Sequence, residues 1–272
     1  MQTARRRLYL EAIGIDLWEP RAPPAPAPAG REPAAAASAA DRAGDSAAEP
    51  AGAEAAAESA AGFSAESAAA GSGAATAAWA ALRAEVLSCT RCPLHVTRTQ
   101  GVLGVGPQRA DWLVIGEAPG AEEDRRGEPF VGAAGQLLDA MLRAIGLDRK
   151  SNVYIANVLK SRPPGNRDPR PEEVAACLPY LVRQVALLEP QIMLAVGRIA
   201  AQNLLATDTS LARLRGRVHH FGERATPLVV TYHPAYLLRT PGDKRKAWED
   251  LKFARSVYQQ LRQGTATDGN RS

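Results

Sequence analysis

Four short apolar runs recur along the chain after residue 81, and each is followed by a loop and then by a helical pattern. The runs lie at 112–116, 153–158, 192–197 and 228–232. Each run is continuously apolar rather than alternating, which is typical of a strand buried on both faces of a sheet. The helical patterns lie at 79–87, 133–145, 171–188, 198–205 and 243–263.

This alternation of strands and helices predicts an α/β fold in which helices cover both faces of a parallel sheet. One domain over residues 79–263 accommodates all of the elements. Ligands of open parallel sheets bind beyond the carboxyl ends of the strands. The segments at those ends are GEAPG at 116–120, NVLK at 157–160, GR at 197–198 and HPAY at 233–236, so we expect the functional site among them.

The region before this domain has a different composition. Residues 22–81 contain one Phe, one Trp and no Leu, Ile or Val. Such a segment cannot bury enough apolar surface to offset the entropy of ordering the chain. We therefore predict a disordered linker over 21–78, and a disordered tail over 264–272.

A short aromatic-containing amphipathic stretch, RRRLYLEAIGIDLW at 5–18, precedes the linker within the N-terminal segment 1–20. As a hypothesis, it docks a replication or repair protein, or it folds back on its own domain. A frayed terminal helix is the simpler alternative.

Charge and cysteine content limit the classes of protein to which this chain can belong. Residues 81–272 hold 27 basic and 19 acidic side chains, a net of +8 against +4 for the whole chain, which favours a polyanionic partner. Three cysteines cannot frame a disulfide scaffold. No apolar run approaches the roughly 20 residues that span a bilayer, and no signal-peptide core follows the N-terminal arginines. We expect a soluble, cytoplasmic protein without a membrane partner.

Four motifs then carry a resemblance to a known family. They are GEAPG at 116–120, EPFVGAAGQLLDAML at 128–142, NVLKSRPPGNRDP at 157–169 and HPAYLLR at 233–239. In this order and spacing they resemble a family 4 uracil-DNA glycosylase, the iron–sulfur type of bacteria and archaea, over roughly residues 81–260. The resemblance implies a three-layer α/β/α sandwich around a four-stranded parallel sheet. It also implies an enzyme that extracts uracil from DNA and hydrolyses its N-glycosidic bond to leave an abasic site.

The resemblance assigns catalysis to two residues. His233 follows the last strand, where it can donate a hydrogen bond to the oxygen of the departing uracil. Glu117 is the carboxylate best placed to activate water, although it could instead only shape the pocket. In glycosylases of related fold an acidic residue can stand one position later, where this chain has Ala118.

The same resemblance assigns uracil binding to the first three loops. The amide of Asn157 matches uracil N3–H and O4, whereas cytosine presents the reversed pattern. Phe130 is suited to stacking on the extruded base, with an ordinary core position as the alternative. The backbone amides between Ala118 and Gly120 could donate to uracil or phosphate.

Basic residues beside these loops suit phosphate contacts: Lys160, Arg162, Arg167 and Arg239. Solvated surface charge is the alternative for each of them. Residues 236–238 could wedge into the base stack. We read the acidic run of Glu122, Glu123 and Asp124 as solvated.

The resemblance further implies a [4Fe–4S] cluster on four cysteines, and this chain has three. Cys89 and Cys92 form the Cys-x-x-Cys pair, Cys177 matches the fourth position, and Ser161 stands at the third. Three outcomes are open: a cluster on three thiolates with another ligand, a zinc ion with a further ligand such as His95, or an empty site with small apolar cysteines. We predict the cluster, and no nucleotide cofactor.

The leading hypothesis is therefore a monomeric base-excision-repair glycosylase acting on uracil-containing DNA. The alternative is a catalytically impaired uracil- or DNA-binding module of the same fold, since fold alone does not decide activity.

Overall fold

The computed structural model describes residues 72–268, and within them the side chains of 73–263. At the centre is a five-stranded sheet in the order β2-β1-β3-β5-β4. The strands are β1 Trp112–Gly116, β2 Val153–Asn157, β3 Ile192–Val196, β4 His219–Phe221 and β5 Thr226–Thr231. Four of them run parallel, as the apolar runs predict, and every residue of β1, β2 and β3 is buried.

The predicted four-stranded sheet was one strand short. β4 pairs antiparallel with β5 at the edge, in a hairpin whose turn includes Gly222 at φ 67°. Its sequence, His-His-Phe, is three residues long and is not an apolar run. An edge strand needs partners on one side only, so it leaves little trace in the hydrophobic pattern.

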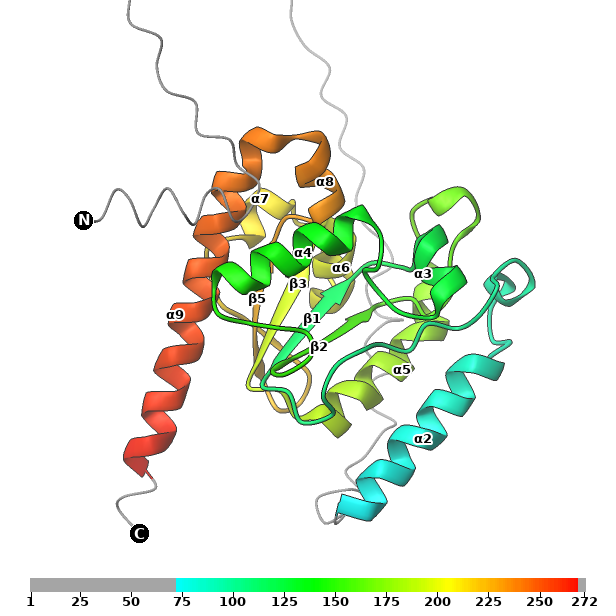
Figure 1. Cartoon of the computed structure of the whole chain (residues 1–272), viewed down its shortest axis with the longest axis horizontal. Coiled ribbons are helices and arrows are strands. Elements are labelled where there is room, and N and C mark those ends of the chain that lie inside the picture. Colours follow the sequence, from blue (N-terminus) through cyan, green and yellow to red (C-terminus); the bar gives the residue numbers. More distant parts are fainter. Residues whose placement is uncertain (1–71, 269–272) are drawn as a thin grey trace, which may run out of the picture. The chain divides into compact units, whose positions relative to one another are not determined.

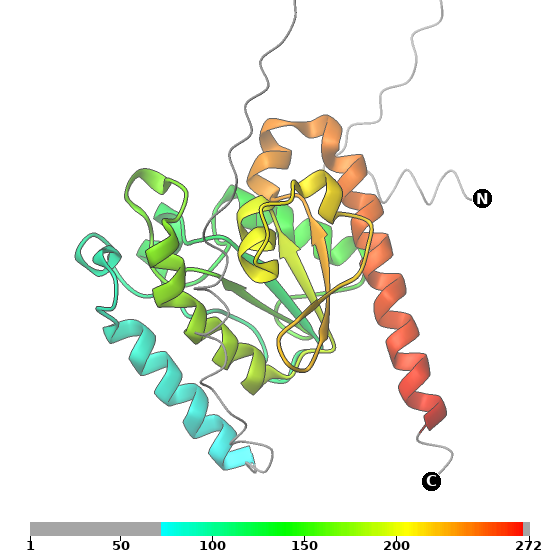
Figure 2. The ribbon, with the colours of Figure 1, turned by 180° about the vertical axis from the view of Figure 1, so that it is seen from behind.

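Helices cover both faces of the sheet (Figures 1 and 2). On one face pack α2 Ser72–Ser88, α5 Pro171–Leu188, α6 Arg198–Leu205 and α7 Leu211–Leu214. On the other face pack α4 Ala133–Ala144, α8 Pro234–Arg239 and α9 Lys244–Asp268. Alternate residues of β1 enter the two cores, with Leu113 and Ile115 in the first and Trp112 and Val114 in the second. The predicted α/β/α sandwich is confirmed.

Two predicted boundaries were wrong. α2 begins at Ser72 rather than 79, because the Ala-rich segment before Trp79 favours helix and is continuous with a helix anchored by that ring. Trp79 is buried, with its ring 5.2 Å from that of Tyr154. α9 continues through the start of the predicted tail to Asp268. The remaining linker, 21–71, and the segment 1–20 lie outside the described residues.

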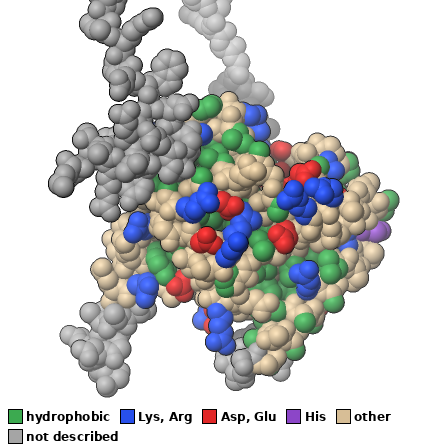
Figure 3. Space-filling model, viewed as in Figure 1, with side chains coloured by type: hydrophobic (Ala, Val, Ile, Leu, Met, Phe, Trp, Pro, Cys, Tyr) green, Lys and Arg blue, Asp and Glu red, His purple; other side chains and the backbone are tan. Residues whose placement is uncertain are grey.

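None of the helices described over 72–268 is long and apolar enough to cross a membrane. Lys and Arg side chains lie among Asp and Glu side chains on the face shown in Figure 3.

Candidate active site

A pocket of about 420 Å³ lies at the carboxyl ends of the strands. The residues predicted to act on uracil all line it: Glu117, Ala118, Gly120, Phe130, Asn157 and His233. Arg167 and Asp168, from the loop before α5, and Tyr236 and Arg239, from α8, also line it. The register of β1 and β2 places Gly116 opposite Asn157, which brings the first and third motifs together.

Gly116 is required at the base of this pocket. A Cβ atom there would lie 2.5 Å from both Asn157 Oδ1 and the Phe130 ring, which is closer than atoms pack. Phe130 is 6% exposed and holds a left-handed backbone at φ 55°. Arg149 donates to its carbonyl at 2.9 Å and to that of Pro129 at 3.3 Å. This conformation is costly for a residue other than glycine, so the structure around Phe130 must hold it, as is common at functional sites.

Asn157 carries an unsatisfied acceptor. Its side chain is 2% exposed, and Oδ1 has no hydrogen-bond partner among the described residues. A buried polar atom without a partner costs free energy that a ligand N–H would recover. The backbone oxygen of Asn157 is held at 2.7 Å by Lys160 Nζ.

His233 is a neutral donor. Its Nδ1 accepts the Ala235 backbone N–H at 3.1 Å, which assigns the ring proton to Nε2. The pKa of His233 is lowered to about 4, chiefly by burial and in part by the positive charge of Arg239, while Glu123 opposes the shift. The ring lies 5.6 Å from that of Phe130. At neutral pH an uncharged imidazole therefore presents Nε2–H beside the aromatic ring.

Glu117 titrates near neutrality. Its pKa is raised to about 7, chiefly by burial and in part by the negative charge of Asp168, while Arg198 opposes the rise. Arg198 Nη2 is 3.1 Å from Asp168 Oδ2. A carboxylate poised in this range can accept a proton from water.

The acidic run after the first loop is not uniformly solvated, and that prediction was wrong for two of its three members. Glu123 accepts backbone N–H groups from Gly120 at 3.1 Å, Val131 at 2.9 Å and Gly132 at 3.2 Å. It thus joins the loop after β1 to the loop that carries Phe130. It lies in α3 Ala121–Arg126, as the third residue after an N-terminal Gly120. The spacing is that of a capping box, but the absence of Ser or Thr at the first position hid it.

Asp124 is the second exception. It is 3% exposed, and both of its carboxylate oxygens accept the Thr99 backbone N–H at 2.9 Å. Glu122 alone fits the prediction, since it is half exposed and pairs with Arg125 at 2.6 Å.

The prediction that Lys160 contacts DNA phosphate was wrong. Its side chain is 1% exposed, and Nζ donates to the Asn157 and Leu103 backbone oxygens and to Gln184 Oε1. Burial lowers the pKa of Lys160 to about 7. Lys160 lies three residues after the end of β2, and these three acceptors compensate for the burial of its Nζ.

The three arginines differ from one another. Arg239 is exposed and lines the pocket. Arg167 also lines it, but its guanidinium makes two bonds to the buried carboxylate of Glu173, at 2.8 and 2.5 Å. Arg162 is half-buried and donates to Asn166 at 2.8 Å. Residues 236–238 were predicted to wedge into the base stack. Of these, Leu237 is buried in the core, whereas Leu238 is 44% exposed.

The cysteine positions meet the requirements of a cluster in part. Cys92 and Cys177 are buried in the same hydrophobic core, and Cys89 packs against it. The pKa of Cys177 is raised to about 11, chiefly by burial. At the third position Ser161 Oγ accepts from Arg98 at 2.7 Å, and Arg98 also donates to the Cys89 carbonyl at 2.9 Å. Among the described residues, no three His, Cys, Asp or Glu side chains are arranged to hold a metal ion. Soft thiols suit iron–sulfur clusters, but their present arrangement would have to tighten.

Comparison with known proteins defines the class. The sequence pattern of the uracil DNA glycosylase superfamily matches residues 103–252, more than half of the chain. A type-4 uracil-DNA glycosylase of Archaeoglobus fulgidus is 47% identical over 174 residues, which cover 62% of this chain and 87% of that protein. A type-4 enzyme of Thermotoga maritima is 42% identical over 177 residues, covering 63% and 90%. A type-5 uracil-DNA glycosylase of Thermus thermophilus is 37% identical over 149 residues, covering 48% and 68%.

The fold, the pocket and these matches define a member of the uracil DNA glycosylase superfamily. Within it, the chain belongs to the type-4 uracil-DNA glycosylases, and the family predicted from the four motifs is confirmed.

Proposed function

We propose that this protein removes uracil from DNA by hydrolysing the N-glycosidic bond, leaving an abasic site. The observation that carries this proposal is the unsatisfied, buried Oδ1 of Asn157 in a pocket that also holds an aromatic ring and a neutral imidazole donor. A flat base with an N–H between two carbonyl groups satisfies all three.

Recognition uses the first three of the four motifs. The target nucleotide leaves the helical stack and enters the pocket, where Phe130 stacks on the base. Asn157 Oδ1 accepts the uracil N3–H, and its Nδ2 donates to O4. Cytosine would place a second acceptor against Oδ1 and a second donor against Nδ2, so the amide discriminates against it.

Bond cleavage places negative charge on the base and positive charge on the sugar. His233 Nε2–H donates to the developing oxyanion at uracil O2, and because the imidazole is neutral it does so without giving up its proton. Glu117 in its ionised form orients water for attack at the sugar carbon and accepts its proton. Ala118 and Gly120 leave their backbone N–H groups for the base or phosphate.

DNA binding uses the rim of the pocket. Arg239 is the exposed cation best placed for a phosphate that flanks the extruded nucleotide, with Arg167 also on the pocket lining and Arg162 in the same loop as Arg167. Leu238 is the exposed apolar side chain that can occupy the space left in the stack.

The iron–sulfur cluster belongs to this proposal with three protein ligands, Cys89, Cys92 and Cys177. In this proposal Ser161 is not a ligand, since its Oγ accepts a hydrogen bond from Arg98. None of the cysteines lines the pocket. A cluster here would therefore join the segment that follows α2 to helix α5, and would not take part in cleavage.

The test of the cluster is iron content and visible absorbance of protein purified without oxygen. Three-cysteine binding predicts iron in the natural protein, loss of it in Cys177→Ser, and a more oxygen-resistant cluster in Ser161→Cys. Iron-free natural protein that is as stable as Cys177→Ser would refute cluster binding.

The remaining assignments concern the whole chain. We propose a cytoplasmic monomer whose residues 5–18 dock a replication or repair protein. Deletion of residues 1–20 should abolish co-purification of that partner and leave uracil release unchanged. Unaltered co-purification would rule the docking role out.

The activity is tested with end-labelled oligonucleotides that contain one uracil, single- and double-stranded, followed by alkaline cleavage at abasic sites. Cleavage is expected from the natural protein, with no release of cytosine. His233→Ala and Asn157→Ala should lose it, whereas His220→Ala, at an exposed position of β4, should not. Tight binding of the uracil oligonucleotide without any release would instead establish the binding module.

A further inference from the structure

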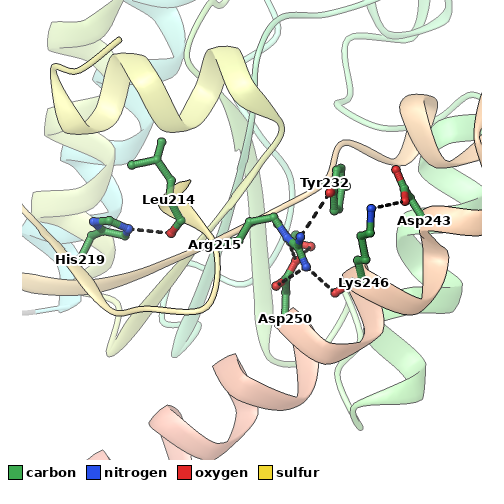
Figure 4. A network of polar contacts seen from close by, with 8 residues as sticks. Leu214, Arg215, His219, Tyr232, Asp243, Lys246 and Asp250 are labelled. Atoms are coloured by element: carbon green, nitrogen blue, oxygen red, sulfur yellow. Dashed lines mark hydrogen bonds and ion pairs between the residues drawn. The ribbon is translucent and has the colours of Figure 1, made fainter. Parts of the chain in front are cut away.

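A buried ion pair lies behind the loop that carries His233, outside the pocket (Figure 4). Arg215 follows α7, and Asp250 lies on α9. Arg215 donates from Nε to Asp250 Oδ2 at 2.6 Å and from Nη2 to Oδ1 at 2.9 Å. The two side chains are 15% and 3% exposed. This two-point geometry fixes the plane of the guanidinium.

The pair holds the two residues that immediately precede His233. Asp250 Oδ2 accepts the Thr231 hydroxyl at 2.8 Å. Arg215 Nη1 donates to the Tyr232 hydroxyl at 3.2 Å, and its guanidinium carbon lies 4.4 Å from the centre of the Tyr232 ring. A cation over an aromatic face and a hydrogen bond at the ring edge together restrict the ring.

The restraint continues to Tyr236, which lines the pocket. The rings of Tyr232 and Tyr236 are stacked, 5.3 Å apart and 13° from parallel. Tyr236 donates through its hydroxyl to Asp243 at 2.7 Å, and Asp243 pairs with Lys246 at 2.8 Å. Arg215 Nη2 donates to the Lys246 carbonyl at 2.9 Å, which closes the network.

Gly197 holds His233 from another direction. Its N–H donates to the Thr231 carbonyl at 2.9 Å, and a Cβ atom at Gly197 would lie 2.9 Å from His233 Cβ. His233 thus lies between the backbone after β3 and a strand end that the ion pair holds in place.

We propose that Arg215 and Asp250 are positioning residues that set the location of His233 Nε2 and of the Tyr236 ring in the pocket. This inference rests on the proposed uracil-releasing function. A buried ion pair contributes little net stability compared with apolar packing, so its value here is the fixed geometry. A catalytic donor displaced by about 1 Å can lose about 100-fold in rate.

The test compares Arg215→Lys with Arg183→Lys. Arg183 makes the same two-point pair with Glu85, joining α5 to α2 away from the pocket. Lysine keeps the positive charge in both variants but cannot make the two-point hydrogen bond to the carboxylate. Single-turnover release of uracil and affinity for an oligonucleotide with non-cleavable 2′-fluoro-deoxyuridine are measured with each.

For Arg215→Lys we expect release to fall by about 10- to 100-fold, with affinity within about threefold of the natural protein. Arg183→Lys should keep the natural rate, whatever its melting temperature. Equal rates for Arg215→Lys and the natural protein overturn the proposal. So does a loss that disappears once the folded fraction is corrected for.

Tyr232→Phe removes only the hydroxyl that Arg215 holds and serves if Arg215→Lys does not fold. It should slow release by severalfold and move the His233 ring resonance in nitrogen-resolved NMR spectra, assigned by its disappearance in His233→Ala. An unmoved resonance with a natural rate would refute the positioning role. If the natural protein itself releases no uracil, the proposed function fails instead.

Discussion

The raised pKa of Glu117 predicts that the rate of uracil release increases between pH 6 and pH 8. As a base, Glu117 acts only when ionised, and its pKa is raised to about 7. Roughly 10% of such a group is ionised at pH 6 and roughly 90% at pH 8, so the single-turnover rate should rise about ninefold between them. An unperturbed glutamate would be almost fully ionised at both, and the rate would be flat.

The perturbation is Asp168→Asn, which removes a negative charge that raises the pKa of Glu117. It also frees Arg198 from its 3.1 Å partner, and Arg198 lowers the same pKa. Both effects act in one direction. We expect the acid limb to move to lower pH by about 0.5 to 1 unit, so the rate at pH 6, relative to its own plateau, rises about three- to fivefold.

The assay is single-turnover uracil release from a single-stranded oligonucleotide between pH 5 and 9 at constant ionic strength. Glu117→Gln should remove the limb together with most of the activity. Asp208→Asn, a carboxylate after α6 that does not line the pocket, should leave the limb in place. An Asp168→Asn profile that coincides with the natural one, or lies at higher pH, would refute the assignment of the limb to Glu117.

Three further predictions concern packing around the pocket. Gly116→Ala should lower the release rate by at least about tenfold, because its Cβ would displace Asn157 and Phe130. Gly197→Ala should slow release similarly, since Gly197 holds φ 101° against His233, whereas Gly242→Ala, with open space around it, should match the natural protein in rate and melting temperature. Glu123→Gln replaces one carboxylate oxygen that accepts a backbone N–H with an NH₂ donor. We expect this variant to bind the 2′-fluoro oligonucleotide more weakly and to show faster hydrogen exchange around Val131. Unchanged exchange would contradict the link between the two loops.

The hydrophobic pattern predicted the elements with long or fully buried runs. The bounds of β1, α5 and α6 agree with the structure to the residue. It missed β4, α3, α7 and α8, all of six residues or fewer. Such elements depend on turns, caps and one-sided pairing, for which a short sequence window carries little signal.

The candidate site also contains residues whose position the sequence predicts and residues whose position it does not predict. Glu117 follows β1, Asn157 ends β2 and His233 lies two residues after β5, so parallel topology alone brings them to one edge of the sheet. Their roles in the reaction stay predictions until the variants are measured. Nothing in the sequence indicated that Lys160 turns inward, because burial of a charged side chain depends on the acceptors around it, and one of these, Gln184, lies on another element.

By itself, then, the sequence determined the class of fold, the family and the strand ends where the pocket lies, since these follow from local apolar runs and from motifs contiguous in the chain. Only the tertiary structure decided which carboxylates are buried, which cations are already paired, and that Arg215 and Asp250 hold the loop before His233. Those properties arise from contacts between residues far apart in sequence, such as the 35 positions that separate Arg215 from Asp250. Charge and hydrogen-bonding capacity are written in the sequence, but the partner that satisfies them is fixed only when distant segments pack together.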